Sequence, residues 1–343
     1  MAAPATLTHE EEAVRAAASG LDATAHEGTP PVHEGTPVHE ATTDHEATPD
    51  HGGTTAHQRT PVHERRPALS PSRINDFKQC PLLFRFRCID RLPEPASSAA
   101  TRGTLVHAVL ERLFDLPAAE RTTESARGLL GPQWDDLCAR EPAVAELFAE
   151  EEETSAWLRG ASALLDTYFT LEDPRRLQPA ERELLCEVEL NSGVLLRGIV
   201  DRIDVARDGA LRIVDYKTGR SPSEQFVGAA LFQMRFYALV LWRLRGVVPR
   251  RLQLIYLGDG QVLTYDPDED SLRATERTVE AVWAAIQQAT LRAAFRPKPS
   301  RLCNWCSHQA LCPEFGGTPP PWPAEGAQRL LATVGGGAVA GQN

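Results

Sequence analysis

The sequence predicts an α/β protein in which a mixed sheet is flanked by helices. Runs rich in Val, Ile and Leu at residues 183–190, 195–205 and 210–216 are separated by turn residues, which is typical of strands. Apolar residues recur at helical spacing before and after these runs. A fourth strand is expected at residues 251–256, after a long helix, and this order of elements predicts a mixed sheet.

Local signals place the individual elements. Ser70 followed by Pro71 is typical of a helix start, with the serine as the cap and the proline in the first turn. The pair Asp208 and Gly209 indicates a hairpin between the second and third strands. The helical patterns predict helices at residues 103–114, 133–150, 155–169, 224–245 and 272–294.

The composition divides the chain into three parts. Residues 1–66 form a degenerate six-residue repeat in which histidine recurs every six positions from His33 to His63. The segment lacks aromatic residues and cannot bury enough apolar surface to offset its chain entropy, so we predict that it is disordered. Residues 67–316 are long enough for one large domain with a helical insertion. Residues 317–343, rich in Pro, Gly and Ala, are expected to form a flexible tail.

The acidic charge belongs mainly to the repeat segment. Residues 1–66 carry 11 acidic and 4 basic side chains, whereas the remainder carries 36 and 32. The acidic net charge of the whole chain therefore does not argue against a nucleic-acid partner. Two clusters could bind phosphates, although each could equally be a solvated helix end. They comprise Arg243, Arg245, Arg250 and Arg251, and then Arg292, Arg296, Lys298 and Arg301.

An acidic pair and a lysine indicate metal-dependent chemistry. Asp215 and Lys217 lie two residues apart in the third strand, so their side chains project from one face. Asp201 on the neighbouring strand adds a second carboxylate. Two carboxylates can hold Mg²⁺ or Mn²⁺, and a nearby cation offsets the charge that develops during phosphodiester hydrolysis. A surface ion pair is the alternative, because Asp-x-Lys alone is a short motif.

Polar residues on two predicted helices support the catalytic interpretation. His107 lies beside the apolar stripe of the helix at residues 103–114, with Glu111 one turn later. Gln233 and Tyr237 share one face of the long helix. Singly, each could be an ordinary boundary residue. Their combination with the acidic pair and the lysine favours a catalytic site over the sheet.

Cysteine spacing predicts a second metal site. Cys303, Cys306 and Cys312 lie close together near the end of the domain, and Cys80 lies near its start. The spacing leaves a [4Fe–4S] cluster and a Zn²⁺ site both open. Seven cysteines without a signal peptide argue against a disulfide framework and favour the cytoplasm. No run of eighteen apolar residues occurs, so no membrane partner is expected.

As an ordered set, the motifs resemble the RecB-type branch of the PD-(D/E)XK nucleases. They are Leu69-Ser70-Pro71-Ser72, Cys80-Pro81, Gly103-Thr104-x-x-His107-x-x-x-Glu111, Gly198-x-x-Asp201-Arg202-Ile203-Asp204, Asp215-Tyr216-Lys217-Thr218-Gly219, Gln233-x-x-x-Tyr237 and the terminal cysteines. Within this branch the chain is similar to the iron–sulfur members, which include AddB-type nuclease domains and CRISPR-associated RecB-like exonucleases. The resemblance covers residues 69–315. It implies a restriction-endonuclease-like fold, with an iron–sulfur staple that joins its N- and C-terminal parts.

The resemblance also implies roles for the residues. The metal ligands would be His107, Asp201 and Asp215, with the Tyr216 carbonyl as a further ligand. The catalytic residues would be Lys217, Asp215 and Asp201, supported by Gln233 and Tyr237. The [4Fe–4S] cluster would be bound by Cys80, Cys303, Cys306 and Cys312, with Zn²⁺ as the alternative metal.

The function implied is that of a Mg²⁺- or Mn²⁺-dependent DNA exonuclease that acts on single-stranded ends in repair or recombination. The alternative is an iron–sulfur DNA-binding subunit of a helicase–nuclease or CRISPR-adaptation complex. The sequence has no G-x-x-x-x-G-K-[ST] motif, so an ATP-driven motor would come from a helicase or integrase partner. The expected location is the cytoplasm, in association with the nucleoid.

The repeat segment should be dispensable for catalysis. We expect a chain that begins at Pro67 to cleave DNA at a rate similar to that of the full chain, because the repeats contribute no core. Initial rates of both proteins at matched metal concentration measure this. A collapse of activity on deletion would give the histidine repeats a functional role.

Overall fold

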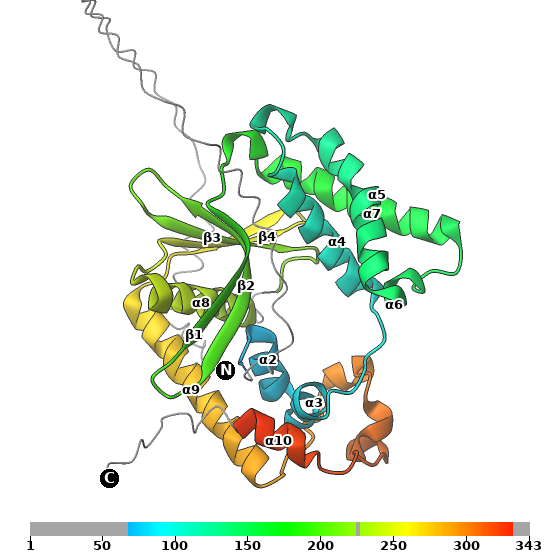
Figure 1. Cartoon of the computed structure of the whole chain (residues 1–343), viewed down its shortest axis with the longest axis vertical. Coiled ribbons are helices and arrows are strands. Elements are labelled where there is room, and N and C mark those ends of the chain that lie inside the picture. Colours follow the sequence, from blue (N-terminus) through cyan, green and yellow to red (C-terminus); the bar gives the residue numbers. More distant parts are fainter. Residues whose placement is uncertain (1–67, 224–226, 332–343) are drawn as a thin grey trace, which may run out of the picture. The chain divides into compact units, whose positions relative to one another are not determined.

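The computed structural model describes residues 68–223 and 227–331 (Figure 1). The chain divides into two units, Met1–Arg65 and Arg66–Asn343, and the first of these lies outside the described residues. The predicted disordered repeat at residues 1–66 therefore lies outside the described part as well. The fold below concerns the second unit.

Five strands form one mixed sheet in the order β1-β2-β3-β4-β5. The first three, β1 (Glu181–Glu189), β2 (Leu195–Val205) and β3 (Leu211–Lys217), are antiparallel neighbours. Strand β4 (Arg251–Tyr256) pairs with β3 in parallel, and β5 (Gln261–Tyr265) is antiparallel to β4. The predicted mixed sheet and its four predicted strands are confirmed, whereas β5 was not predicted.

One helical layer packs on the face of the sheet that carries Val214 and Tyr216. It contains α4 (Ser98–Leu113), α5 (Thr123–Arg140), α6 (Pro142–Ala145) and α7 (Glu151–Leu171), which Figure 1 shows as one group. Leu105, Val109 and Leu165 from these helices are buried against the sheet. Helices therefore flank this face of the sheet, as the sequence predicts.

The opposite face is covered by α8 (Val227–Arg245) and α9 (Glu269–Leu291). Phe236 and Leu239 of α8 are fully buried in one cluster with Ile213 and Leu252 of the sheet. The N-terminal segments α2 (Pro71–Gln79), α3 (Pro81–Phe84) and η1 (Arg85–Asp90) pack into the same cluster. The short helical turns are η2 (Ala118–Glu120), η3 (Pro174–Arg176), η5 (Arg301–Trp305), η6 (Gln309–Leu311) and η7 (Pro313–Phe315).

Capping side chains set the helix starts. Ser70 accepts a hydrogen bond from the Arg73 amide, so the predicted start of α2 is confirmed. The bounds of the helix predicted at residues 133–150 are wrong, because α5 begins at Thr123, ten residues earlier, and ends at Arg140, before Pro142. Pro132 is exposed within α5, where water can satisfy the carbonyl that its missing N–H leaves free.

Part of the predicted flexible tail is ordered. Helix α10 (Ala324–Leu331) lies within residues 317–343 and packs on α9 and η1. Gly326 permits this packing, since a Cβ there would lie 2.7 Å from the Ile89 carbonyl oxygen. The expectation of a loose tail is therefore wrong for residues 324–331, and residues 332–343 lie outside the described part.

None of the helices in the described ranges combines the length and the apolar character that crossing a lipid bilayer requires.

Candidate active site

Four elements bring the predicted catalytic side chains together near the end of β3. Asp215 and Lys217 lie on β3, and Asp201 lies on β2 beside them. His107 reaches the site from α4 in one helical layer, whereas Gln233 comes from α8 in the other. The site thus forms where the two helical layers meet the same end of the sheet.

Asp215 is the most enclosed carboxylate of the site, with 2 % exposure. Its Oδ2 lies 2.5 Å from the Lys217 Nζ. Its Oδ1 accepts a hydrogen bond of 3.0 Å from the Gln233 amide nitrogen, which also donates to the Tyr237 hydroxyl at 3.1 Å. Gln233 therefore fixes the orientation of the carboxylate, and the carboxylate fixes the position of the lysine.

Gly198 makes room for this arrangement. A Cβ at Gly198 would lie 2.6 Å from the Tyr237 ring, closer than any side chain tolerates. Because Gly198 has no side chain, the Tyr237 ring can lie against β2 at this position and accept the Gln233 hydrogen bond. The glycine of the Gly198-x-x-Asp201 motif thus has a packing role.

Asp201 is held by the backbone of the neighbouring strand. Its Oδ2 accepts a hydrogen bond of 2.7 Å from the Tyr216 amide. Burial and the nearby Asp215 carboxylate raise the pKa of Asp201 well above its usual range. Two close, buried carboxylates resist joint ionisation unless a cation lies between or beside them.

His107 presents one ring nitrogen to these carboxylates. Its Nε2 lies 2.9 Å from the Tyr216 carbonyl oxygen, and since a carbonyl can only accept, Nε2 carries the proton. The lone pair of Nδ1 then lies 3.5 Å from an Asp201 oxygen and 3.8 Å from a Glu183 oxygen. Burial lowers the pKa of His107, which favours the neutral ring that a metal ligand requires.

Glu183 joins the site without having been predicted. The register of β1 and β2 sets it opposite Asp201, between regular pairs on either side. Its backbone is left-handed, with φ 44°, a conformation that a non-glycine residue adopts at a cost. Residues 182 and 184 would normally face the same side of the sheet. Here Arg182 donates to the Glu111 carbonyl of α4 on one side, whereas Leu184 packs toward α8 on the other, so the alternation of side chains is broken at Glu183. The break directs the Glu183 carboxylate to the site.

His107, Glu183 and Asp201 can each offer one ligand atom such that these atoms lie within 4.8 Å of one another. Among the described residues, no other group of three histidine, cysteine or acidic side chains lies close enough together to hold one ion. One imidazole and two carboxylates suit Mn²⁺ or Mg²⁺. Asp215, predicted as a ligand, is adjacent and raises the pKa of Asp201 and Glu183, but it is paired with Lys217.

The metal-free protein should show a pH dependence that originates at Glu183. Burial, then the charges of Glu111 and Asp215, raise the pKa of Glu183 to about 7 from its ordinary 4.5. Between these values the unfolded chain loses a proton that the folded protein keeps, so stability falls as the pH rises. Glu183→Gln should therefore stabilise the chelated protein at pH 8, by on the order of 1–2 kcal/mol given 30 % side-chain exposure, and change little at pH 5.

Urea unfolding of the chelated protein at both pH values measures this difference. Glu187→Gln, on the exposed side of the same strand, is the matched control and should not produce it. Equal stability of the Glu183→Gln variant and the natural protein at pH 8 would contradict the expectation.

A buried arginine supports the site from behind. Arg202 is 1 % exposed and is neutralised by Glu172 at 2.8 Å and Asp204 at 3.1 Å. It donates to the Tyr216 hydroxyl and lies over the same ring, 5.5 Å from the centroid. The backbone of Tyr216 contacts both Asp201 and His107, so this network fixes the strand on which the site is assembled.

A cleft of about 650 Å³ opens beside the site. His107 and Glu183 lie in its lining, with residues of α4 on the same side and Gln133, Asp136 and Arg140 of α5 as a further wall. The helical layer of α4 and α5 thus contributes directly to this cleft.

The four predicted cluster ligands line one small pocket. Cys80 links α2 to α3, whereas Cys303, Cys306 and Cys312 lie among the turns η5, η6 and η7. Burial, together with the other three thiols, raises the pKa of Cys312. All four thiols line this pocket, although no three of their sulfur atoms lie within 4.8 Å of one another in the described part of the chain. Thiolates are ligands of both iron–sulfur clusters and zinc ions.

A buried histidine fastens this cysteine segment to the N-terminal part. His308 is 4 % exposed, bonds Glu94 at 2.8 Å and contacts the Phe86 ring edge-on. The pocket therefore joins distant parts of the chain through ordinary side-chain contacts as well as through its thiols.

The first predicted basic cluster is ion-paired. Each of its four arginines contacts a carboxylate on the surface. The pairs are Arg243–Glu276, Arg245–Glu181, Arg250–Asp208 and Arg251–Asp266. The structure favours a solvated surface over a phosphate track for this cluster.

Comparison with protein families decides the classification. The sequence model of a family described as the PD-(D/E)XK nuclease superfamily matches residues 68–313. This range contains the sheet, both helical layers and all four cysteines of the pocket. The chain belongs to the PD-(D/E)XK nuclease superfamily. PD-(D/E)XK nucleases use divalent metals, in agreement with the ligand group formed by His107, Glu183 and Asp201.

Curated relatives fall into two kinds. Gene 69 protein of Mycobacterium phage D29 is 25% identical over 277 residues, and that of phage L5 is 25% identical over 294 residues. Each alignment covers 72% of this chain and 96% of the phage protein. One subunit of the ATP-dependent helicase/deoxyribonuclease of Streptococcus mutans is 29% identical over 161 residues, which are 45% of this chain and 14% of that protein. The RecB-type resemblance of this PD-(D/E)XK nuclease is thereby confirmed, whereas its iron–sulfur branch stays a prediction.

Proposed function

We propose that the protein is a metal-dependent DNA exonuclease that acts on single-stranded ends in DNA repair or recombination. The observation that carries the proposal is the convergence of His107, Glu183 and Asp201 beside the Asp215–Lys217 ion pair. A structural ion pair would not require three further ligand groups at the same place. The superfamily supports the reaction class, phosphodiester hydrolysis.

A divalent metal, when bound, would supply Lewis-acid polarisation of the scissile phosphate and a lowered pKa for the attacking water. His107, Glu183 and Asp201 would hold it, with Asp215 as a further carboxylate at the edge of the group. These side chains fit the ion because they place one neutral imidazole and close carboxylates in a half-buried site.

Lys217 would act on the charge that develops at the phosphate. Its ammonium group is held at 2.5 Å by Asp215, which is itself fixed by Gln233. A cation positioned before the reaction stabilises the transition state without a reorganisation cost. Gln233 and Tyr237 would therefore act by positioning, and Tyr237 would also border the DNA backbone.

We further propose that Cys80, Cys303, Cys306 and Cys312 bind a [4Fe–4S] cluster, with Zn²⁺ as the alternative. The proposal is supported by the pocket that all four line and by the RecB-type resemblance of the chain. The Streptococcus mutans relative is a subunit of a helicase/deoxyribonuclease, which supports a helicase as the partner protein. The cytoplasmic, nucleoid-associated location belongs to the same proposal.

Digestion of end-labelled DNA tests the proposal. Single- and double-stranded substrates are incubated with the protein in Mg²⁺ or Mn²⁺, and the products are resolved by length over time. We expect progressive shortening of single strands from an end, and no reaction with EDTA. Tight DNA binding without cleavage in either metal would instead favour a DNA-binding subunit whose partner supplies the catalytic activity.

A further inference from the structure

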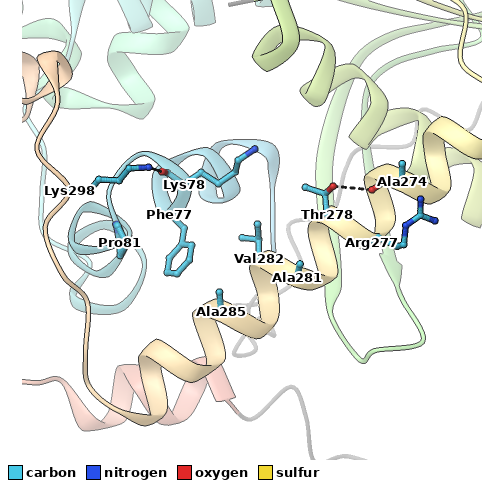
Figure 2. Close-up of a pocket in the computed structure, with 10 residues that line it drawn as sticks. All are labelled: Phe77, Lys78, Pro81, Ala274, Arg277, Thr278, Ala281, Val282, Ala285 and Lys298. Carbon is cyan, nitrogen blue, oxygen red and sulfur yellow. Dashed lines mark hydrogen bonds between the residues drawn. The ribbon is translucent and has the colours of Figure 1, made fainter. Parts of the chain in front are cut away.

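A surface groove between α2 and α9 combines cations with an apolar floor (Figure 2). Its volume is about 760 Å³, and it lies outside the cleft that opens beside His107. Lys78 from α2, Arg277 from α9 and Lys298 from the segment after α9 supply positive charge. The groove is therefore assembled from elements that are distant in sequence.

Helix α9 provides the floor. Ala281, Val282 and Ala285 form part of a stripe that runs beside the buried stripe of the helix. The small alanines leave space over the helix, and Figure 2 shows the Phe77 ring projecting from α2 toward this surface. Phe77 is half-buried and is braced edge-on by Phe84, with ring centroids 5.6 Å apart. A braced, partly exposed ring is suited to stacking with a planar ligand.

The charge of the groove is uncompensated. Its lining contains three cations and no carboxylate. In the described ranges, Lys78, Arg277 and Lys298 form no ion pair, in contrast to the arginines of the first basic cluster. Lys298 also donates a 3.0 Å hydrogen bond to the Lys78 carbonyl, which fixes one rim of the groove. Such a surface attracts a polyanion.

One end of the groove approaches the helix that serves the catalytic site. The Lys78 ammonium lies 5.0 Å from the centre of the Phe232 ring on α8. Phe232 directly precedes Gln233, which bonds Asp215. The groove and the active site are thus connected by adjacent residues of one rigid element.

We propose that this groove holds a segment of the single-stranded DNA whose end is cleaved at the active site. Phosphates would contact Lys78, Arg277 and Lys298, and a base would stack on Phe77. The bases of a duplex already stack on one another and could not contact the apolar floor. A single strand exposes base faces that can stack on it. The proposal rests on the proposed nuclease function and adds to it a second, non-catalytic contact surface.

A charge inserted into the floor provides the sharpest test. Ala281→Glu adds a carboxylate at an exposed helical position in the groove, and glutamate is a good helix former. Gln287→Glu adds the same charge to α9 outside the groove and is the matched control. We expect the affinity for a fluorescent 20-nucleotide oligo(dT), measured by anisotropy with Ca²⁺, to fall at least tenfold for the first variant and less than twofold for the second.

Removal of the three cations should also make the binding of DNA less dependent on salt concentration. For Lys78→Gln combined with Arg277→Gln and Lys298→Gln, the slope of log affinity against log salt should become shallower by about 2, because each lost phosphate contact removes about 0.7 for a single strand. Arg207→Gln, an exposed arginine in the turn after β2, should leave the slope unchanged. Equal affinities and slopes for the groove variants and their controls would overturn the proposal, and would leave the groove to an acidic protein partner.

A small substrate separates this proposal from the proposed function. Hydrolysis of bis(p-nitrophenyl) phosphate with Mn²⁺ requires the active site but cannot span the groove, so all groove variants should retain the rate of the natural protein. A natural protein that hydrolyses neither this ester nor DNA would refute the nuclease activity, while the anisotropy measurements still decide the groove. Loss of ester hydrolysis in the groove variants would refute a purely DNA-binding role for the groove.

Discussion

Replacement of Asp215 by alanine should abolish DNA cleavage and largely preserve the fold. The carboxylate holds the Lys217 ammonium at 2.5 Å and receives the Gln233 amide, so its loss releases both partners from their catalytic positions. Lys217→Ala should retain metal and DNA binding but lose rate by roughly two to three decades, the scale of removing one preorganised transition-state stabiliser. Single-turnover digestion of end-labelled DNA measures both rates.

The control must remove an aspartate or its ion pair without touching the site. Asp208→Asn fits this purpose, because Asp208 lies on the surface and pairs with Arg250 at 3.1 Å. It should cleave DNA at the rate of the natural protein. Thermal unfolding of all variants verifies that they fold. Undiminished digestion by a folded Asp215→Ala or Lys217→Ala variant would refute the catalytic assignment.

Loss of any cysteine of the pocket should reduce stability and solubility as well as activity. Cys80 and Cys303 are 223 residues apart, so a metal group bound to both closes a very long loop. In chain-entropy terms, derived from disulfides, a closure of this length stabilises the folded state by about 5 kcal/mol. Ligation adds bond energy, because the site hardly exists in the unfolded chain. Urea unfolding of the anaerobically purified serine variants measures the loss.

Metal content distinguishes the cluster from zinc. Anaerobically purified protein should be brown and contain about four irons per chain, the stoichiometry of a [4Fe–4S] cluster. The Cys138 thiol packs against the core formed by α4, α5 and α7. Cys138→Ala should therefore keep the iron and change stability through packing alone. Colourless protein with one tightly bound zinc would rule out the cluster, although the long loop would remain closed.

The strands could be predicted wherever apolar runs are bounded by turns. Strands β2 and β4 begin and end where the sequence predicts, because each is a buried run flanked by charged or turn residues. Strand β5 has a weaker pattern: Val262 is 41 % exposed, and the strand pairs along one side with β4. The Asp259–Gly260 pair before it, with Gly260 at φ 68°, is a turn signal that could have revealed the hairpin.

The candidate site was accessible from the sequence except for one residue. His107, Asp201, Asp215, Lys217 and Gln233 come together because each lies on a predictable element and belongs to an ordered set of motifs. Glu183 carries no local signal, since it is one of several glutamates in and around this strand. Its place in the site depends on strand register and on a left-handed backbone, and neither can be derived from the residues nearby.

Protein synthesis begins at the N-terminus, so Cys80 leaves the ribosome long before residues 303–312 have been made. Until Phe295 follows, the rings of Phe77 and Phe84 lack a contact that they have in the finished protein, where Phe84 and Phe295 stack at 6.2 Å. A chain released before Phe295 would carry every proposed catalytic residue but would lack the ring that stacks on Phe84.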